Sequence, residues 1–97
     1  EWAVVVGLCR MDLQVPESES LKHKRRVLKS VISHVRREFN VSIAEVDHQD
    51  SWQLVTLAAV CVSTDAAYVQ GLLERVVRYI DGSRFDLVLL DYENELF

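Results

Sequence analysis

The feature that most constrains the fold is the order in which apolar periodicities change along the chain. Strand-like runs of apolar residues alternate with stretches that have helical spacing. The strand-like runs are 2–15, 41–48, 52–63 and 84–96. The helical stretches are 20–39 and 65–82. The predicted order of elements is therefore β-α-β-β-α-β.

Local signals set the ends of the two predicted helices. Ser18 or Ser20 in the turn "PESES" provides an N-cap for the first helix, and Asp65 caps the second, which Gly82 ends. The run 52–63 is apolar on both faces, which indicates a central strand. Because crossover connections are right-handed, both helices are expected on one face of a four-stranded antiparallel sheet. The whole chain, 1–97, is predicted to form a single ferredoxin-like α+β domain.

Composition narrows the class of protein further. The chain has 97 residues, and 49% of them are hydrophobic, which is enough for one buried core. No apolar run reaches the roughly 18 residues that a membrane span needs, and "WAVVVGLC" is typical of a strand rather than a signal peptide. Cys9 and Cys61 lie in separate apolar runs without a CxxC spacing. We expect a cytoplasmic protein with two reduced thiols and no membrane association.

Positive charge is concentrated in one helix of an acidic chain. Residues 20–37 contain seven basic and no acidic residues, so this segment carries +7 and leaves −11 on the rest of a chain whose net charge is −4. All but Lys24 fall on a stripe beside the apolar arc of the helix. Lys24 falls within that arc, near its start, where its stem can extend past the edge of the core. The predicted nucleic-acid-binding residues are Lys22, Lys24, Arg25, Arg26, Lys29, Arg36 and Arg37.

This charge needs a counter-charge, which is either internal or external. No acidic residue within the segment is available for pairs between residues three or four positions apart. Cations in the first turns of a helix also oppose its dipole, at about 0.3–1 kcal/mol each. The internal candidates are Glu17, Glu19 and the turn around Asp47 and Asp50. The external candidate is RNA phosphate.

The open face of the predicted sheet provides a second candidate surface. Its apolar half is expected to bind a partner or a second copy of the chain. The predicted partner-binding residues are Trp2, Val4, Val6, Leu8, Leu87 and Leu89. The rest of the face carries Asp91, Glu93 and Glu95, and the central strand lacks aromatic residues at the positions where RRM domains stack bases. Binding of a protein partner or formation of a homodimer is therefore favoured over RNA binding at this face.

The stretch "EVDHQD", 45–50, places carboxylates around His48. Such a pattern occurs in metal sites and in general acid–base pairs, but a set of four ligands is not visible, and Asp and His caps in a hairpin turn are the favoured explanation. The sequence contains no P-loop, GxGxxG or GxSxG motif. We expect no catalytic residue, no metal and no cofactor, and hence a protein that is not an enzyme.

Three stretches, "ESLKHKRRVLKSV", "FNVSIAEVDHQDSWQ" and "LDYENELF", closely resemble the YlxP-like family of small bacterial proteins of unknown function. The resemblance implies the ferredoxin-like fold and no established catalytic role. Genes of this family tend to lie beside those for translation initiation factor two and ribosome-binding factor A, which implies a ribosome-associated role. The positions that match the family pattern are Ser20, Leu21, Lys22, Lys24, Arg25, Phe39, Asn40, Val41, Glu45, Asp50, Trp52 and Gln53.

These observations predict a non-catalytic protein that binds ribosomal RNA or the small ribosomal subunit through its basic helix. The alternative is a protein–protein adaptor or a self-associating module that uses the open face of the sheet.

Overall fold

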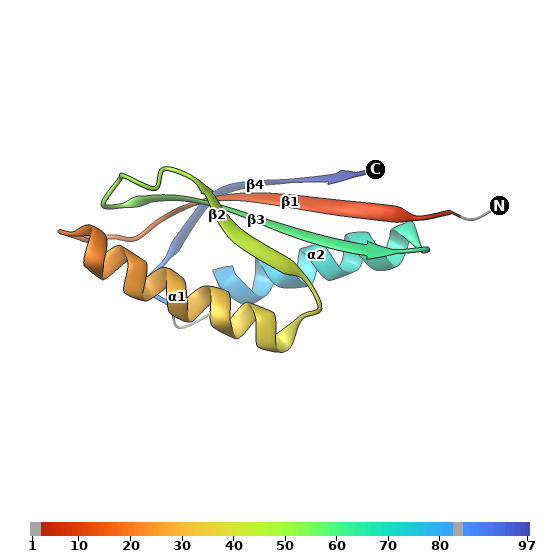
Figure 1. The fold of residues 1–97 in the computed structure, drawn as a ribbon, viewed down its shortest axis with the longest axis horizontal. Helices are drawn as coiled ribbons and strands as arrows, with labels where there is room; N and C mark the ends of the chain where they lie inside the picture. Colours follow the sequence, from red (N-terminus) through yellow and green to blue (C-terminus); the bar gives the residue numbers. More distant parts are fainter. Residues whose placement is uncertain (1–2, 83–84) are drawn as a thin grey trace.

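The computed structural model describes residues 3–82 and 85–97. The elements in chain order are β1 (Val5–Gln14), α1 (Leu21–Glu38), β2 (Ser42–Asp47), β3 (Leu54–Ser63), α2 (Ala66–Asp81) and β4 (Val88–Leu96). The strands form one sheet in the order β2-β3-β1-β4, and every neighbouring pair is antiparallel. Both helices lie on the same side of this sheet (Figure 1). The predicted ferredoxin-like α+β fold is confirmed.

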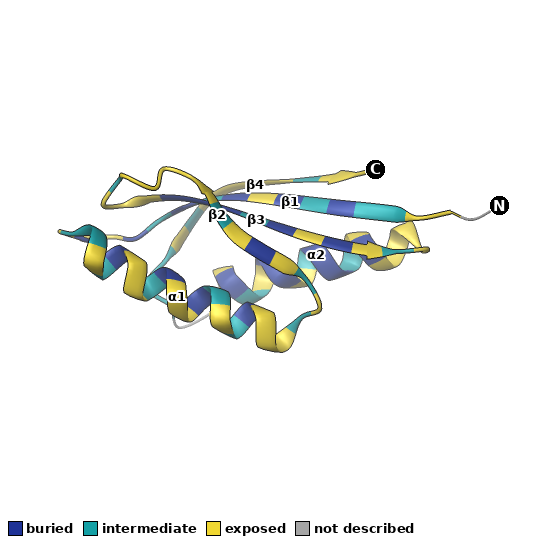
Figure 2. Ribbon diagram, in the orientation of Figure 1, coloured by how far each residue is buried: buried dark blue, intermediate teal, exposed yellow. Residues whose placement is uncertain are grey.

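The core lies between the helices and the sheet. In β1 the odd-numbered residues from Cys9 to Leu13 are buried, and in β3 Val55, Leu57 and Ala59 are buried. Figure 2 shows the resulting alternation of buried and exposed residues along both central strands. The helices add the apolar stripes that the sequence predicts, because residues three and four positions apart share one helix face. The buried helix residues are Lys24, Leu28, Val31 and Val35 in α1, and Val69, Leu72, Leu73, Val76, Val77 and Ile80 in α2.

Side-chain caps start both helices. The Ser20 hydroxyl accepts a hydrogen bond from the His23 amide at 3.1 Å, which makes Ser20 the cap of α1. Ser18 is buried and donates its hydroxyl proton to the Ser20 carbonyl at 3.1 Å. Asp65 accepts from the amides of Ala67 and Tyr68 at the start of α2. Each cap satisfies amides that have no partner inside the helix.

The last strand differs from the sequence-based prediction in its start and its register. It begins at Val88, and its pairing with β1 shifts so that Leu13 lies opposite Leu89 while Asp12 lies opposite Asp91. The extra residue between these pairs is a β-bulge, which reverses the faces of the residues before it. Leu89 and Leu87 pack against the core as partly buried residues. The prediction that these two leucines lie on the open face is wrong.

The molecule is elongated, with principal extents of 52 × 22 × 19 Å. The two ends of the described chain lie at one end of the sheet, whereas the connection between β2 and β3 and the start of α1 lie at the other (Figure 1). Trp2 and position 84, where the last strand was predicted to begin, lie outside the described residues.

Candidate nucleic-acid interface

The basic residues of α1 divide into one buried cation and a group of exposed ones. Lys24 is 1% exposed. The other predicted phosphate-binding residues are all exposed, and we refer to them as the basic stripe. These residues are Lys22, Arg25, Arg26, Lys29, Arg36 and Arg37.

Lys24 binds the connection between β2 and β3. Its Nζ donates to the carbonyl oxygens of His48, Ser51 and Leu54 at 2.6, 2.7 and 2.8 Å. An ammonium group has three protons, so these bonds use its full donor capacity. Glu45 Oε2 lies 3.2 Å from the same nitrogen as a counter-ion. This oxygen is buried and accepts no hydrogen bond from a described residue, because the Lys24 protons are taken.

The structure therefore removes Lys24 from the predicted nucleic-acid interface. Its ammonium is enclosed and neutralised, and exposing it to a phosphate would leave three carbonyls and Glu45 without a partner. The sequence indicated this position on the helical wheel, where Lys24 falls in the apolar arc. It did not identify the carbonyls, which come from residues 24 to 30 positions later in the chain.

The basic stripe runs between two open grooves. On one side, a groove of about 560 Å³ separates α1 from the edge strand β2, and Lys29, Ser33 and Arg36 form its helix wall. Arg36 Nη2 donates a hydrogen bond to the Ile43 carbonyl oxygen at 3.1 Å. This bond satisfies one of the carbonyl groups on the edge of β2. Edge carbonyls are otherwise available for pairing with another chain.

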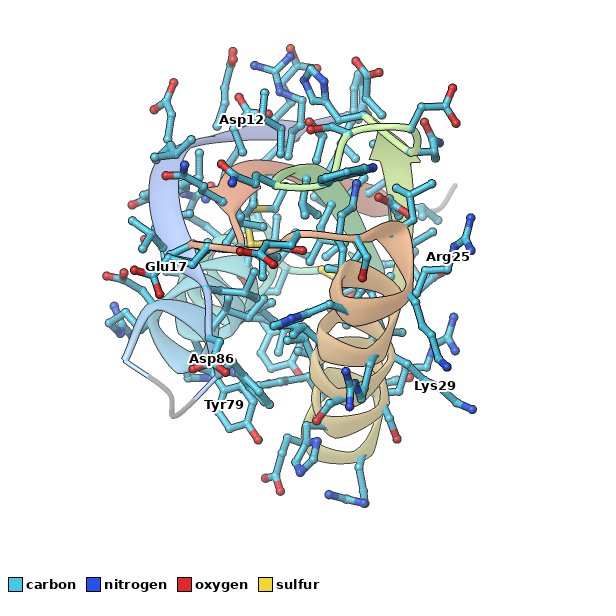
Figure 3. All side chains as sticks on the ribbon, turned by 90° about the vertical axis from the view of Figure 1, so that its left-hand side faces the viewer. Asp12, Glu17, Arg25, Lys29, Tyr79 and Asp86 are labelled. Carbon is cyan, nitrogen blue, oxygen red and sulfur yellow. The ribbon has the colours of Figure 1, made fainter. Side chains whose placement is uncertain are left out.

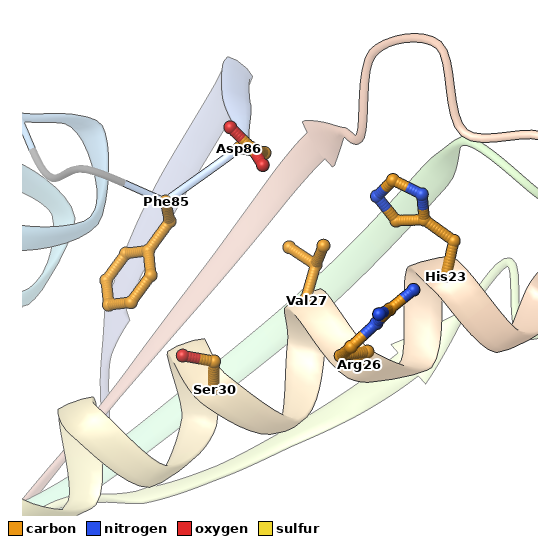
Figure 4. A pocket seen from close by; sticks show the side chains of 6 residues that line it. All are labelled: His23, Arg26, Val27, Ser30, Phe85 and Asp86. Atoms are coloured by element: carbon orange, nitrogen blue, oxygen red, sulfur yellow. The ribbon is translucent and has the colours of Figure 1, made fainter.

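On the other side, a groove of about 420 Å³ lies between α1 and the segment before β4. His23, Arg26, Val27 and Ser30 line the helix wall, and Phe85 and Asp86 line the opposite wall (Figure 4). Arg26 faces this groove, but it forms no ion pair with a described residue.

Within residues 3–82 and 85–97, no member of the basic stripe forms an ion pair. The pairs present there join Arg10 to Asp12 at 3.8 Å, Arg10 to Glu93 at 3.9 Å, and Lys24 to Glu45. Seen from the end of the molecule, Arg25 and Lys29 point away from the side on which Glu17 and Asp86 lie (Figure 3). In the described part of the chain, Lys24 is thus the one basic residue of α1 that forms an ion pair.

The turn around His48 is held by backbone contacts. His48 has a φ of 62°, a left-handed conformation that is uncommon outside glycine. Its carbonyl accepts from Lys24, and its amide donates to Asp47 Oδ1 at 2.7 Å. Among the residues that the structure describes, no three His, Cys, Asp or Glu side chains are placed to hold a metal ion. In the motif "EVDHQD", the His48 carbonyl and the Glu45 carboxylate contact Lys24, and Asp47 Oδ1 accepts from the His48 amide.

The open face of the sheet has an apolar end that the sequence located only in part. Val6 lies opposite Val62, Leu8 lies opposite Val60, and Phe97 exchanges two backbone hydrogen bonds with Val6. Val62 and Phe97 are 65% and 67% exposed. The predicted Val4, Val6 and Leu8 thus share this surface with residues of β3 and the C-terminus. The signal that could have found them is the pairing of β1 with β3, which places even-numbered residues of both strands together.

A polar cluster joins α2 to β4 near Cys9. Glu74 accepts hydrogen bonds from the Tyr92 hydroxyl at 3.0 Å and the Asn94 amide at 2.9 Å. Burial, with a smaller contribution from Glu74, raises the pKa of the Cys9 thiol to about 12. Because the thiolate is the reactive form, this thiol is a poor nucleophile at neutral pH.

No helix in the described part of the chain has the length and apolar character that crossing a membrane requires.

Comparisons with known proteins agree with the resemblance noted in the sequence. The chain is 35% identical over 78 residues to "Uncharacterized protein YlxP" of Bacillus subtilis (strain 168), a match that covers 80% of this chain and 85% of that protein. Among solved structures it is similar to "De novo designed protein Foldit4", with a TM-score of 0.54, 21% identity, and coverage of 97% of this chain and 96% of that one. This similarity shows the fold alone.

A weaker match is to the structure of a REP-associated tyrosine transposase bound to a REP hairpin, with a TM-score of 0.44 and 11% identity. It covers 95% of this chain and 55% of the other. A family model described as "Protein of unknown function (DUF503)" matches residues 6–94. The chain belongs to this family.

Proposed function

We propose that the protein is a non-catalytic, cytoplasmic RNA-binding protein whose basic stripe lies along the phosphates of ribosomal RNA. The observation that carries the proposal is the set of exposed cations on α1 that have no ion-pair partner among the described residues. Phosphate binding would supply the missing counter-charge and release counter-ions from the RNA.

The position of the charges on the helix supports this proposal. Lys22, Arg25 and Arg26 lie in the first two turns of α1, which contain no acidic residue. The partial positive charge of the helix start adds to theirs, so this end of the helix favours an anion. The stripe continues to Arg37, about 22 Å along the axis at 1.5 Å per residue. A surface of this length suits an extended polyanion better than a single small anion.

Binding to a fragment of small-subunit ribosomal RNA at several salt concentrations tests the proposal. The logarithm of the association constant should fall linearly with the logarithm of salt concentration. The double variant Arg25→Ala/Lys29→Ala should flatten the slope by about 0.7–0.9 for each phosphate that it no longer neutralises. A matched control is Arg10→Ala/Arg75→Ala, which removes the same charge from exposed positions off the stripe. Binding without salt dependence, or an equal loss of affinity in the control, would contradict the proposal.

The same variants address the ribosomal partner. Co-sedimentation with purified small subunits should depend on Arg25 and Lys29 if the stripe binds RNA exposed on the subunit surface. Failure to co-sediment, together with normal binding to the naked fragment, would remove the assembled subunit as a partner while leaving RNA binding in place.

A second candidate function, self-association, is favoured by the apolar end of the open face. Val62 and Phe97 are exposed on the two sides of Val6, and Val60 is exposed opposite Leu8. Contiguous exposed apolar surface is typical of interfaces. Sedimentation equilibrium should show a dimer that Val62→Glu dissociates and that Tyr68→Glu, at another exposed position on α2, preserves. A monomer at high protein concentration would rule this candidate out.

A further inference from the structure

We propose that Trp52 is a base-stacking platform beside the start of the basic stripe, so that the RNA bound here is single-stranded. An unpaired base stacks on the indole while Lys22 and Arg25 hold the phosphates that flank it. This inference rests on the proposed RNA-binding function and specifies which form of RNA the site takes.

Trp52 is a large side chain that the fold leaves in solvent. It is 55% exposed, and it does not belong to the core or to the hydrophobic residues packed against it. In the described ranges its indole takes part in no hydrogen bond, ion pair or ring contact. A tryptophan that served packing alone would have its ring against other side chains. More than half of the surface of this residue is accessible to solvent.

The backbone on both sides of Trp52 is nevertheless fixed. Lys24 holds the carbonyls of Ser51 and Leu54, at 2.7 and 2.8 Å. The Ser51 hydroxyl oxygen accepts from the amides of Gln53 and Leu54, and the Gln53 carbonyl accepts from Val15 at 2.8 Å. Because this backbone is fixed, the indole can move only by changing its side-chain rotamer. Binding then loses less conformational entropy than it would with a mobile loop.

The same hydrogen bonds tie the connection that carries Trp52 to the first turns of α1, where the basic stripe begins. Lys24 reaches the connection from the first turns of α1. Arg25 follows Lys24 and Lys22 precedes it by two positions, so both cations lie within one helical turn of Lys24 along the axis, on other sides of the helix. The start of α1 and the connection between β2 and β3 share one end of the molecule (Figure 1). A stacked base and its neighbouring phosphates therefore meet the indole and the cations together.

The carboxylates in this region define the direction that the strand takes. Asp47 and Asp50 are exposed in the turn and repel phosphates. Glu17 lies on the side of the molecule opposite to Arg25 and Lys29 (Figure 3). The backbone of the bound strand is thereby directed over α1 toward Lys29 and away from the turn. Stacking on an aromatic ring tolerates any base, so we expect weak sequence preference.

Titrations followed by fluorescence and anisotropy test the inference. The ligand is a single-stranded oligouridine of about 12 nucleotides, a length within the range that single-strand binding sites span. In a Trp2→Phe background, Trp52 is the one tryptophan that remains, and its emission should be quenched on binding. Trp52→Leu should weaken binding by about 5- to 150-fold with an unchanged salt slope. Trp52→Phe should retain most of the affinity, because a smaller aromatic face remains. A single-stranded DNA of the same length should depend on Trp52 in the same way, because stacking does not use the 2′-hydroxyl.

A duplex RNA of equal charge is the control ligand. Its bases are paired and stacked on each other, so Trp52→Leu should leave its binding unchanged. Equal affinity of Trp52→Leu and the parent for the single strand, or unquenched emission at saturation, overturns the stacking role while the proposed function stands. Absence of salt-dependent binding to either RNA overturns both. Circular dichroism and the urea midpoint of Trp52→Leu should match the parent, which confirms that the variant folds.

Discussion

Lys24 and Arg25 are neighbours in the sequence and opposites in the structure. Lys24 is buried, uses all three of its protons on backbone carbonyls, and has Glu45 as a counter-ion. Arg25 is exposed and has no ion-pair partner in residues 3–82 and 85–97. One step along a helix rotates the side chain by about 100°. That rotation separates a cation that holds the fold together from a cation that is free to bind something else.

The difference shows that the charge of a segment does not report its role. The cluster "KHKRR" looks uniform, yet it contains the residue that anchors the connection between β2 and β3 and the residues that form the basic stripe. Stability and binding should therefore respond in separate ways to substitutions only one or two positions apart. The largest of these effects is expected at Lys24 and the smallest at Lys22.

Lys24→Met should lower the free energy of unfolding by about 3–5 kcal/mol, because it leaves three carbonyls and the buried Oε2 of Glu45 without their cation. Urea denaturation followed by circular dichroism measures this change. Lys22→Met removes the same charge from an exposed position two residues earlier in the helix. It should change the free energy of unfolding by about 0.5 kcal/mol or less. Similar destabilisation in the two variants would break the distinction between the two kinds of cation.

Glu45→Gln should destabilise by about 1–3 kcal/mol, less than removal of Lys24, because the Lys24 ammonium keeps its three carbonyl acceptors. Glu19→Gln, at an exposed position before α1, is the matched control and should have almost no effect. In Lys24→Met/Glu45→Gln the combined destabilisation should be less than the sum of the separate values, since both substitutions act on one ion pair. Full additivity would show that Glu45 does not act through Lys24.

Arg36→Ala should lower the free energy of unfolding by about 0.5–1.5 kcal/mol, because it removes the hydrogen bond to the Ile43 carbonyl. Arg37→Ala, one position further and without such a bond to a described residue, should be close to neutral. The urea midpoints of the two variants show whether Arg36, unlike Arg37, contributes to the stability of the fold. Equal destabilisation by the two substitutions would show that the hydrogen bond from Arg36 to the Ile43 carbonyl does not stabilise the fold.

Lys22→Glu should raise the free energy of unfolding by about 0.3–1 kcal/mol while it weakens RNA binding, because an acidic residue in the first helical turn complements the helix dipole. Thermal unfolding and the salt-dependent RNA titration measure the two effects on the same protein. Lys22→Gln should give about half of each. A variant with lowered stability would show that Lys22 has an internal partner.

Much of the fold could be predicted from periodicity and caps. The order of the elements, the Ser20 and Asp65 caps and the central position of β3 are confirmed. These features depend on neighbours within a few residues, and the sequence carries that information directly. The prediction failed at Leu87 and Leu89, because the bulge opposite Asp12 and Leu13 adds a residue that alternation does not reveal. The binding roles of the stripe and of the open face stay predictions.

The sequence by itself determined where the positive charge lies and which helix face carries it, because a helical repeat converts spacing into direction without knowledge of the rest of the chain. Only the tertiary structure decided which cation is neutralised. The partners of Lys24 are carbonyls and a carboxylate more than twenty residues away, and backbone groups look alike in every sequence. Their meeting depends on how α1 packs against the connection between β2 and β3. The same packing fixes the backbone on both sides of Trp52, whose side chain is exposed.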